Sequence, residues 1–358
     1  MGWDVEVRAL EQDAWPAWEK FVASAPGGSV YSLPGYLDAL CTAGGGRFRI
    51  LGVMRGEEIV GGVALYERTS RGGPFVSPRL LLYYNGVVVR RYETSYPSEA
   101  TARHVKILTA LETALSGMQL GSINLRSRGL HDVRPFVSKG WSVAPSYSYV
   151  VPLDLAAAWG KVEQNLRRLI DRARNAGMTL SDADDSFDDF FRLHEATLDR
   201  HGAGVYLPRE AFRKFCGALG RNGLGKLYQV RTKDGAPAAA QLVLLGPHTV
   251  SHTACAGADP ELNKQGASAF LRWSAFETLS ALGYKGNDLT DASLNPVTHF
   301  KSQLGGTLEL SLVLQSPRSR RYVWNERADT AVARARSRAG ALVRRIARRG
   351  ANGSEGSA

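Results

Sequence analysis

The sequence predicts a mixed α/β protein built from two copies of one unit. The order hairpin, strand, long helix, short strand occurs twice, beginning near residue 48 and again near residue 227. Within each copy the hydrophobic spacing changes from a period of two to a period of 3.6, which is typical of strands alternating with helices. At 358 residues the chain also exceeds the length that one hydrophobic core usually supports.

Each copy begins with a strand–turn–strand pattern. The first hairpin is predicted at residues 48–66 and the second at residues 227–245, where Asp234-Gly235 supplies the turn. The elements expected after the hairpins are a strand at 80–89 or 249–256, a helix at 98–116 or 265–282, and a short strand at 122–126 or 286–290. Each copy then closes with Phe-x-Ser, at Phe136 and at Phe300, and a last strand.

These elements predict an N-terminal domain at residues 1–152, a C-terminal domain at 153–316 and a tail at 317–358. A helical insert opens the second domain. Its first helix is expected at 155–176, with Asp154 as the N-cap residue. Two further helices are expected at 186–200 and 208–219.

The positive charge of the chain is concentrated in the tail. The net charge is +11, but residues 317–358 hold 11 arginines and three acids, so the rest has 34 basic and 31 acidic side chains. Residues 328–349 place apolar side chains on one helical stripe and arginines mostly opposite. This amphipathic helix is interpreted either as a contact with an anionic membrane surface or as a basic extension without a partner. The nearly neutral body disfavours a large tRNA-binding surface.

Composition excludes several classes of protein. No apolar run is long enough for a membrane span, and the acidic N-terminus does not resemble a signal peptide. The cysteines Cys41, Cys216 and Cys255 are scattered, which fits reduced thiols. We therefore expect a cytoplasmic protein, peripheral at most to the inner face of the membrane. No nucleophile elbow, P-loop or metal-ligand cluster occurs, so no metal and no permanently bound cofactor is predicted.

Four stretches of the second copy carry a more specific pattern. They are residues 165–177, 194–202, 288–293 and 300–306, the last reading Phe-Lys-Ser-Gln-Leu-Gly-Gly. Together with the duplication, they resemble the GNAT superfamily, and in particular its FemA/FemB/FemX-like tandem branch. The resemblance implies that an amine attacks an activated acyl group taken from acyl-CoA or aminoacyl-tRNA. The amine acceptor would be a small or lipid-linked molecule of the cell envelope or of polysaccharide metabolism.

A donor-binding site is expected where a strand leads into the predicted helix at 265–282. Free backbone N–H groups and the helix dipole favour an anion at such a helix start. Two glycines near the C-terminus would let the backbone approach the ligand closely. The predicted donor-binding residues are Asn263, Gly266, Ser268, Gly305 and Gly306.

Three residues are candidates for the chemistry itself. Lys301 could neutralise a phosphate or a developing oxyanion. His252 lies within a predicted strand and Asp288 ends the next one, so either could accept the proton of the amine. Transfer of this proton by the substrate itself, with no dedicated base, stays open.

Acceptor binding is assigned to side chains outside the donor loop. Arg168 and Arg172 lie on the charged face of a helix, which is either solvated or binds acceptor phosphate. Tyr206 is a further candidate. Val137 occupies the position in the first copy that Lys301 occupies in the second, so the first copy is expected to be structural or to bind the acceptor.

Two other functions remain open. One is aminoacyl-tRNA-dependent peptidyl transfer onto a peptidoglycan precursor, although the sequence has no sustained heptads for the coiled-coil hairpin that often accompanies tRNA use in this family. The other is a non-catalytic binding protein that keeps the GNAT fold without its chemistry.

Overall fold

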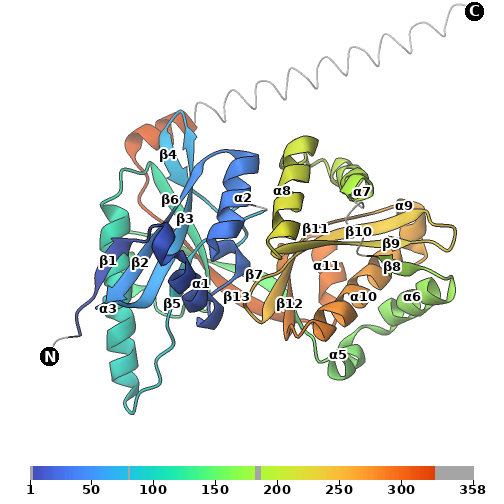
Figure 1. Ribbon diagram of the computed structural model, residues 1–358, viewed down its shortest axis with the longest axis horizontal. Helices are drawn as coiled ribbons and strands as arrows, with labels where there is room; N and C mark the ends of the chain where they lie inside the picture. The colour runs from blue at the N-terminus through green and yellow to red at the C-terminus, as the bar shows by residue number, and fades with distance from the viewer. Residues whose placement is uncertain (1–2, 80, 182–186, 327–358) are drawn as a thin grey trace, which may run out of the picture.

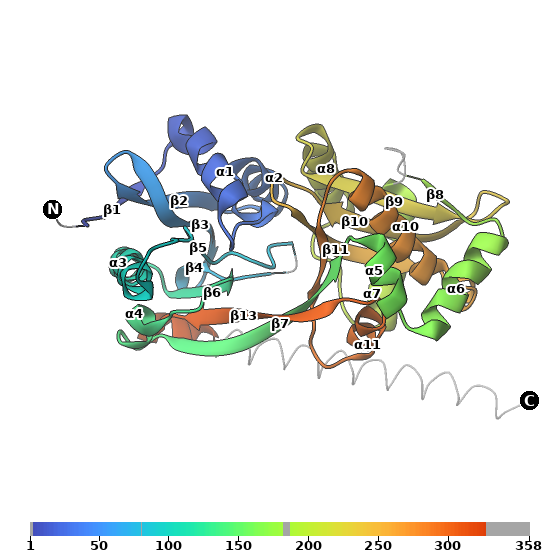
Figure 2. The same cartoon turned by 90° about the horizontal axis from the view of Figure 1, so that it is seen from below.

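The computed structural model describes residues 3–79, 81–181 and 187–326. Its strands form one continuous mixed sheet in the order β1-β2-β3-β4-β6-β13-β7-β12-β11-β10-β9-β8, with β5 paired to β3. Figure 1 shows two α/β bodies side by side, and Figure 2 shows that β7 and β13 run from one body into the other. The tail helix predicted at 328–349 lies outside the described residues.

The first unit comprises the elements from β1 to β7. They are β1 (Glu6–Ala9), α1 (Trp15–Ser24), α2 (Pro34–Gly44), β2 (Arg47–Arg55), β3 (Glu58–Ser70), β4 (Gly73–Val76), β5 (Val87–Val89), α3 (Pro97–Ser116), β6 (Ser122–Arg128), α4 (Arg134–Val137) and β7 (Ser142–Pro152), with 3₁₀ turns at Gln12–Ala14 and Val30–Ser32.

The second unit comprises the elements from α5 to β13. They are α5 (Leu155–Lys161), α6 (Gln164–Asn175), β8 (Thr179–Ser181), α7 (Phe187–Arg200), α8 (Arg209–Arg221), β9 (Gly225–Arg231), β10 (Pro237–Leu244), β11 (Val250–Ala258), α9 (Pro260–Lys264), α10 (Ala267–Ala281), β12 (Gly286–Asp291), α11 (Pro296–Ser302) and β13 (Thr307–Gln315).

The two units repeat the same order of elements, so the predicted mixed α/β duplication is confirmed. In each unit a strand and two helices precede the hairpin, β2–β3 in the first and β9–β10 in the second. A long helix, a strand, a short helix and a last strand follow. One element is shorter than expected, because only β5 forms a strand within 80–89.

The last strands of the two units are exchanged. β7 pairs with β12 of the second unit, and β13 pairs with β6 of the first. The two exchanged strands also pair with each other along nine residues, from Thr307–Val150 to Gln315–Ser142. Neither unit therefore completes its sheet alone, and the predicted boundary after residue 152 cuts through a shared sheet.

The helix predicted at 155–176 is two helices. Asp154 caps the first as expected, because its carboxylate accepts the N–H of Ala157. The break falls at Val162 and Glu163, whose backbones are extended. The amide N–H of Glu163 donates to the carbonyl of Gln303 at 3.0 Å instead of continuing the helix. A tertiary contact with the α11–β13 turn thus overrides the local helical pattern.

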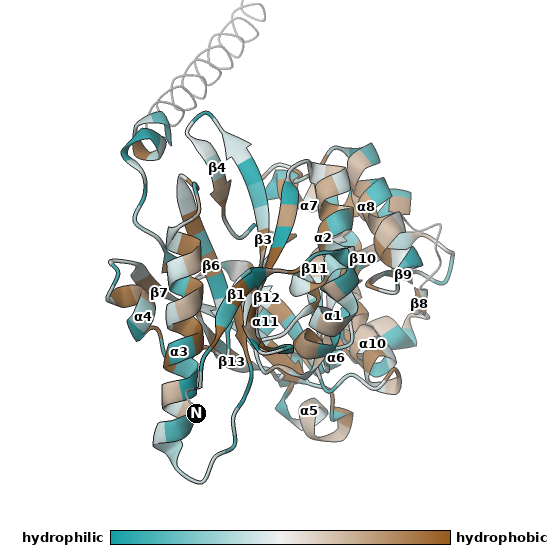
Figure 3. Cartoon of the chain, turned by 60° about the vertical axis from the view of Figure 1, so that its left-hand side comes forward, coloured by the Kyte–Doolittle hydropathy of each residue, from teal (hydrophilic) through white to brown (hydrophobic). Residues whose placement is uncertain are grey.

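The hydrophobic core has three parts, one of which lies between the units. Each unit buries a long helix on its half of the sheet: α3 buries one face, whereas the first half of α10 is buried on all sides. Figure 3 shows hydrophobic and polar bands alternating along α3, as expected for a helix that buries one face. Between the units, the ring of Tyr36 on α2 lies 5.7 Å from that of Phe215 on α8. Exchanged strands and a shared apolar core therefore hold the two units together.

Candidate active site

The second unit contains a place where two parallel strands separate. β11 and β12 pair only from Val250–Gly286 to His252–Asp288. Immediately afterwards β11 carries a bulge, since Ala254 has no partner in the register with β10. Bulges bend a strand and commonly lie beside functional sites. Beyond His252, the edge of β11 that faces β12 is therefore no longer paired with that strand, and a gap opens in the sheet there.

Side chains of α7 bind the exposed edge of β11. His194 lies with Nδ1 3.0 Å from the carbonyl of Ala256, so Nδ1 must carry the proton. Arg200 donates to the carbonyl of Ala258 at 3.0 Å, and Thr197 accepts the N–H of the same residue at 3.3 Å. Burial lowers the pKa of His194, which keeps the ring neutral near pH 7. The helix α7 thus forms one wall of the gap.

A cavity of about 310 Å³ occupies the space beside this edge, and we call it the α10 pocket. It is lined by residues of α7, the end of β11, the start of α10 and α11: Thr197, Arg200, His201, Ala256, Gly257, Ala258, Asn263, Ser268, Leu271, Arg272, Val297 and Phe300. Among the described residues no carboxylate lines it, whereas two arginines do. Such a lining favours an anionic ligand.

Arg272 is the buried cation of this pocket. Its side chain is held by the side-chain oxygen of Gln241 on β10. Burial lowers the pKa of Arg272 to about 10, so the guanidinium remains charged at neutral pH. A charge held in place inside a partly apolar pocket acts more strongly on a ligand than a solvated one.

The loop predicted to bind the donor forms the mouth of the α10 pocket. Gly266 precedes α10 with a φ of +101°, a conformation that favours glycine. The side chain of Asn263 accepts the N–H of Ser268 at 3.3 Å, and both residues line the pocket. A Cβ on Gly266 would lie 2.2 Å from the carbonyl oxygen of Leu169, so α6 packs tightly against the loop.

Gly266→Ala is expected to lower the free energy of unfolding by about 2–5 kcal/mol, because left-handed strain and a backbone clash act together. Gly283→Ala is the matched control. Gly283 also has a positive φ, +90°, but a Cβ there would meet no atom within 4 Å. It should lose only about 1–2 kcal/mol. Urea unfolding of both variants measures the difference, and equal losses would show that contact with α6 does not constrain the loop.

Lys301 holds the end of β12. Its ammonium donates to the carbonyls of Thr290 at 3.0 Å and Asp291 at 2.6 Å. Thr290 has a φ of +52°, a strained conformation for a β-branched residue. Burial, and then the nearby Arg272, lower the pKa of Lys301 to about 8. Lys301 does not line the α10 pocket, but its neighbour Phe300 does.

The structure places Asp288 at the interface between the units. The carboxylate is fully buried and accepts hydrogen bonds from Tyr84 at 2.9 Å, Ser148 at 3.3 Å and the N–H of Thr290 at 2.7 Å. Arg128 of the first unit lies 3.8 Å away. Burial raises the pKa of Asp288. Asp288 does not line the α10 pocket. Its side chain contacts Tyr84, Ser148 and Arg128 of the first unit, so it joins the two units.

His252 lies in the same buried cluster. Its Nδ1 is 3.7 Å from the carboxylate of Asp288, and its ring lies 5.1 Å from that of Tyr31. Burial, and then Arg128, lower the pKa of His252 well below the usual value. Neither ring nitrogen has a hydrogen-bond partner among the described residues. His252 also does not line the α10 pocket.

The remaining predicted site residues also lie outside the pocket lining. Gly305 packs on α5 and Gly306 on β7, where an added Cβ would lie 3.0 Å from a backbone oxygen in each case. Arg168 and Arg172 are exposed on one face of α6, within one turn of Leu169, which contacts the loop. Tyr206 follows α7 and is 37% exposed. The two glycines therefore serve close packing of the turn before β13.

Sequence reasoning missed the residues that α7 and the interior of α10 contribute. Arg200 and His201 lie inside the stretch at 194–202, which indicates the family resemblance but predicts no role for either residue. Arg272 had a usable signal, because it is an arginine within the apolar sequence of α10. Thr290 gave no signal, since a positive φ for threonine cannot be read from residue type.

Comparisons with known proteins agree with this fold. Residues 160–302 match a family model described as acetyltransferase (GNAT) domain. FemX is similar in structure with a TM-score of 0.67 and 12% sequence identity, covering 86% of this chain and 96% of that one. No curated protein matches the sequence significantly.

Two further solved structures share the fold. One is the C-terminal domain of a putative lysylphosphatidylglycerol synthetase from Agrobacterium fabrum, with a TM-score of 0.54, 12% identity, and coverage of 87% of this chain and 94% of that one. The other is a tandem GNAT protein from the clavulanic acid biosynthesis pathway, with a TM-score of 0.54, 11% identity, and coverage of 88% and 100%. At these identities the likeness establishes the fold.

Proposed function

Because the chain has a tandem GNAT fold of the FemX-like kind, we propose that it is an N-acyltransferase that moves an acyl group from acyl-CoA to an amine. The observation that carries the proposal is the α10 pocket. It combines a gap between parallel strands, a helix N-terminus and a lining with two arginines and no carboxylate. Those features suit a donor with phosphate groups and a reactive acyl end.

In the proposed reaction, the amine nitrogen attacks the carbonyl carbon of the thioester. A C–N bond forms, the C–S bond breaks, the amine loses a proton and the thiolate leaving group gains one. Negative charge develops on the carbonyl oxygen in the transition state. Lys301 donates to two backbone carbonyls and has a third N–H left. We assign to Lys301 the positive charge that stabilises this oxygen, beside Phe300 of the pocket wall.

Phosphate groups of the donor would extend past the mouth of the pocket. Arg168 and Arg172 lie within one helical turn of Leu169, the residue of α6 that contacts the loop at Gly266. We therefore place these arginines on the donor side of the site and not on the acceptor side. Acyl-CoA and aminoacyl-tRNA both carry phosphates, so this placement supports either donor. Aminoacyl-tRNA is the second candidate, which would make the protein an aminoacyl transferase acting on a peptidoglycan precursor.

A transfer assay with the purified full-length protein separates the candidates. Radiolabelled acyl-CoA or aminoacyl-tRNA is offered with amino sugars, peptides and lipid-linked amines. Transfer from acyl-CoA supports the proposal, whereas transfer from aminoacyl-tRNA alone selects the second candidate. No transfer and no calorimetric binding of either donor would leave a non-catalytic binding protein.

Arg200→Gln is expected to weaken donor binding by about tenfold, because one charge-assisted hydrogen bond is lost. Arg192→Gln is the matched control on the same helix, since Arg192 is exposed, pairs with Asp189 and does not line the pocket. Calorimetric titration with the donor measures both variants. Equal affinities of the two variants would place the donor elsewhere.

A further inference from the structure

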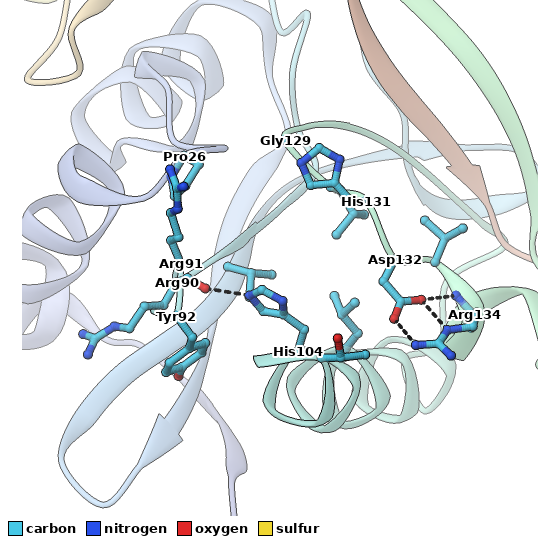
Figure 4. Close-up of a pocket in the computed structure, with 14 residues that line it drawn as sticks. Pro26, Arg90, Arg91, Tyr92, His104, Gly129, His131, Asp132 and Arg134 are labelled. Atoms are coloured by element: carbon cyan, nitrogen blue, oxygen red, sulfur yellow. Dashed lines mark hydrogen bonds and ion pairs between the residues drawn. The ribbon is translucent and has the colours of Figure 1, made fainter. Parts of the chain in front are cut away.

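The first unit contains a second and larger cavity, of about 820 Å³, which we call the α3 pocket. It lies between the end of β5, α3 and the segment that joins β6 to α4, as Figure 4 shows. Its lining residues are Pro26, Val89, Arg90, Arg91, Tyr92, Thr101, His104, Leu108, Gly129, Leu130, His131, Asp132, Val133 and Arg134.

The α3 pocket occupies the same place in its unit as the α10 pocket does in the other. In the second unit the cavity lies between the end of β11, the first half of α10 and α11. In the first unit the matching elements are β5, α3 and α4, in the same chain order. Duplication has thus given each unit a cavity beside its long helix. The lining side chains differ, so the two cavities suit different ligands.

The charges around the α3 pocket leave one cation uncompensated. Arg134 binds Asp132 through two hydrogen bonds, of 2.7 and 3.0 Å, and so neutralises that carboxylate. Arg90 binds Glu58. Arg91 is exposed and forms no hydrogen bond or ion pair with the described residues. The pocket is therefore net positive, with its unpaired charge on the wall formed by the end of β5.

Two imidazoles complete the polar wall. Figure 4 shows His131 on the side opposite Arg91, with His104 of α3 below them. The Nε2 of His104 lies 2.9 Å from the carbonyl oxygen of Arg90, so this nitrogen carries the proton. The ring is thereby fixed, and its unprotonated Nδ1 can accept a hydrogen bond from a hydroxyl or amide of a ligand, whereas His131 is left to donate to a phosphate. Guanidinium and imidazole groups arranged around one cavity are typical of phosphate recognition.

The rest of the lining is apolar. Val89, Leu108, Leu130 and Val133 contribute aliphatic side chains, and Tyr92 contributes a half-buried ring. Inorganic phosphate alone would leave this surface and most of the volume without contacts. A cavity of this size matches an organic molecule the size of a nucleotide.

We propose that the α3 pocket binds a small phosphorylated organic molecule. Its phosphate contacts Arg91 and His131, and its organic part packs on Leu108 and Leu130. This binding site is separate from the α10 pocket and does not depend on the proposed transfer reaction. Within that reaction, the molecule bound here would be the phosphorylated acceptor or an effector.

Calorimetric titration of the full-length protein with pyrophosphate, uridine diphosphate and adenosine diphosphate tests the proposal. At least one of the two nucleotides should bind, and more tightly than pyrophosphate. Arg91→Gln and His131→Gln should each weaken that binding by about tenfold or more. Arg68→Gln is the matched control, because Arg68 is an exposed arginine of the same unit that does not line the pocket.

The titrations of the variants show in which of the two pockets the nucleotide binds. Binding that is lost in Arg91→Gln but kept in Arg68→Gln and Arg200→Gln supports a phosphate site in the first unit. Binding lost only in Arg200→Gln would mean that the nucleotide occupies the α10 pocket, and the proposal fails. It also fails if no nucleotide binds the wild-type protein, or if Arg91→Gln binds normally. Circular dichroism confirms that the variants are folded.

Discussion

Lys301→Met is expected to lower the turnover number for acyl transfer by about 10²–10³-fold, with a smaller change in KM. The reason is that, in the proposed reaction, the ammonium stabilises charge that develops only in the transition state. Its position is fixed by the carbonyls of Thr290 and Asp291. Steady-state kinetics with the donor that the transfer assay selects measure the effect.

The pH dependence of turnover tests whether Lys301 acts through its positive charge or only through the space that its side chain fills. The pKa of Lys301 is lowered to about 8, so a reaction that needs its positive charge should slow as the pH rises through that value. Lys301→Arg keeps a cation at all these pH values. It should recover part of the activity and lose this alkaline limb. A Met variant with normal turnover, or an Arg variant with the same alkaline limb, would remove Lys301 from the reaction.

Asp288→Ala is expected to lower the free energy of unfolding by about 3–5 kcal/mol, because it leaves a buried arginine without its carboxylate. Arg128 has only 14% of its side chain exposed. The hydroxyl of Tyr84 and the N–H of Thr290 also lose their acceptor. Urea unfolding measures the loss. Asp171→Ala is the control, since this exposed carboxylate on α6 should contribute less than about 0.5 kcal/mol.

Asp288→Asn tests the protonation of this site. Burial raises the pKa of Asp288, so the folded protein holds this proton to a higher pH than the unfolded chain does. The stability contributed by the proton is complete below the ordinary value of 3.8 and is lost as the pH rises through the raised pKa. The Asn variant lacks this titration, so its stability relative to wild type should improve with rising pH. A constant difference would show that Asp288 has an ordinary pKa.

A catalytic role for Asp288 makes the opposite prediction. If Asp288 took the proton of the amine, the Asn variant would lose turnover in proportion to its missing basicity and keep its stability. The carboxylate accepts hydrogen bonds from two side chains of the first unit and one backbone N–H of the second, and it does not line the α10 pocket. We therefore expect Asp288→Asn to change mainly the free energy of unfolding and to change turnover much less.

Some of the candidate site was predictable from local sequence. The segment Asn263–Ser268 was predicted to join a strand to a helix; in the structure it joins the end of the short helix α9 to α10, and Asn263 and Ser268 line the α10 pocket. Its geometry depends on neighbouring residues and on one glycine with a positive φ, which turn chemistry indicates directly. Phe300, which lines the pocket, is also positioned by local sequence, because its short helix α11 begins at a cap in which Asn295 accepts the N–H of Thr298.

Other parts of the site were not predictable because they depend on distant residues. Arg200 reaches the pocket only because α7 packs along the edge of β11, more than 50 residues later in the chain. His252 and Asp288 were placed correctly on adjacent strands, but their surroundings are Tyr31, Tyr84 and Arg128 of the other unit. Burial by another unit decides whether a strand carboxylate meets solvent or protein, and periodicity does not contain that information.

The sequence by itself determined the order of strands and helices, the duplication and the turn that opens α10, since periodicity and turn residues act within a few positions. The tertiary structure alone decided that β7 and β13 exchange places, because either sheet edge could satisfy the hydrogen bonds of either strand. That exchange brings Ser148 to Asp288 and joins the units through one sheet. It therefore makes Asp288 part of the interface, while the α10 pocket lies entirely within the second unit.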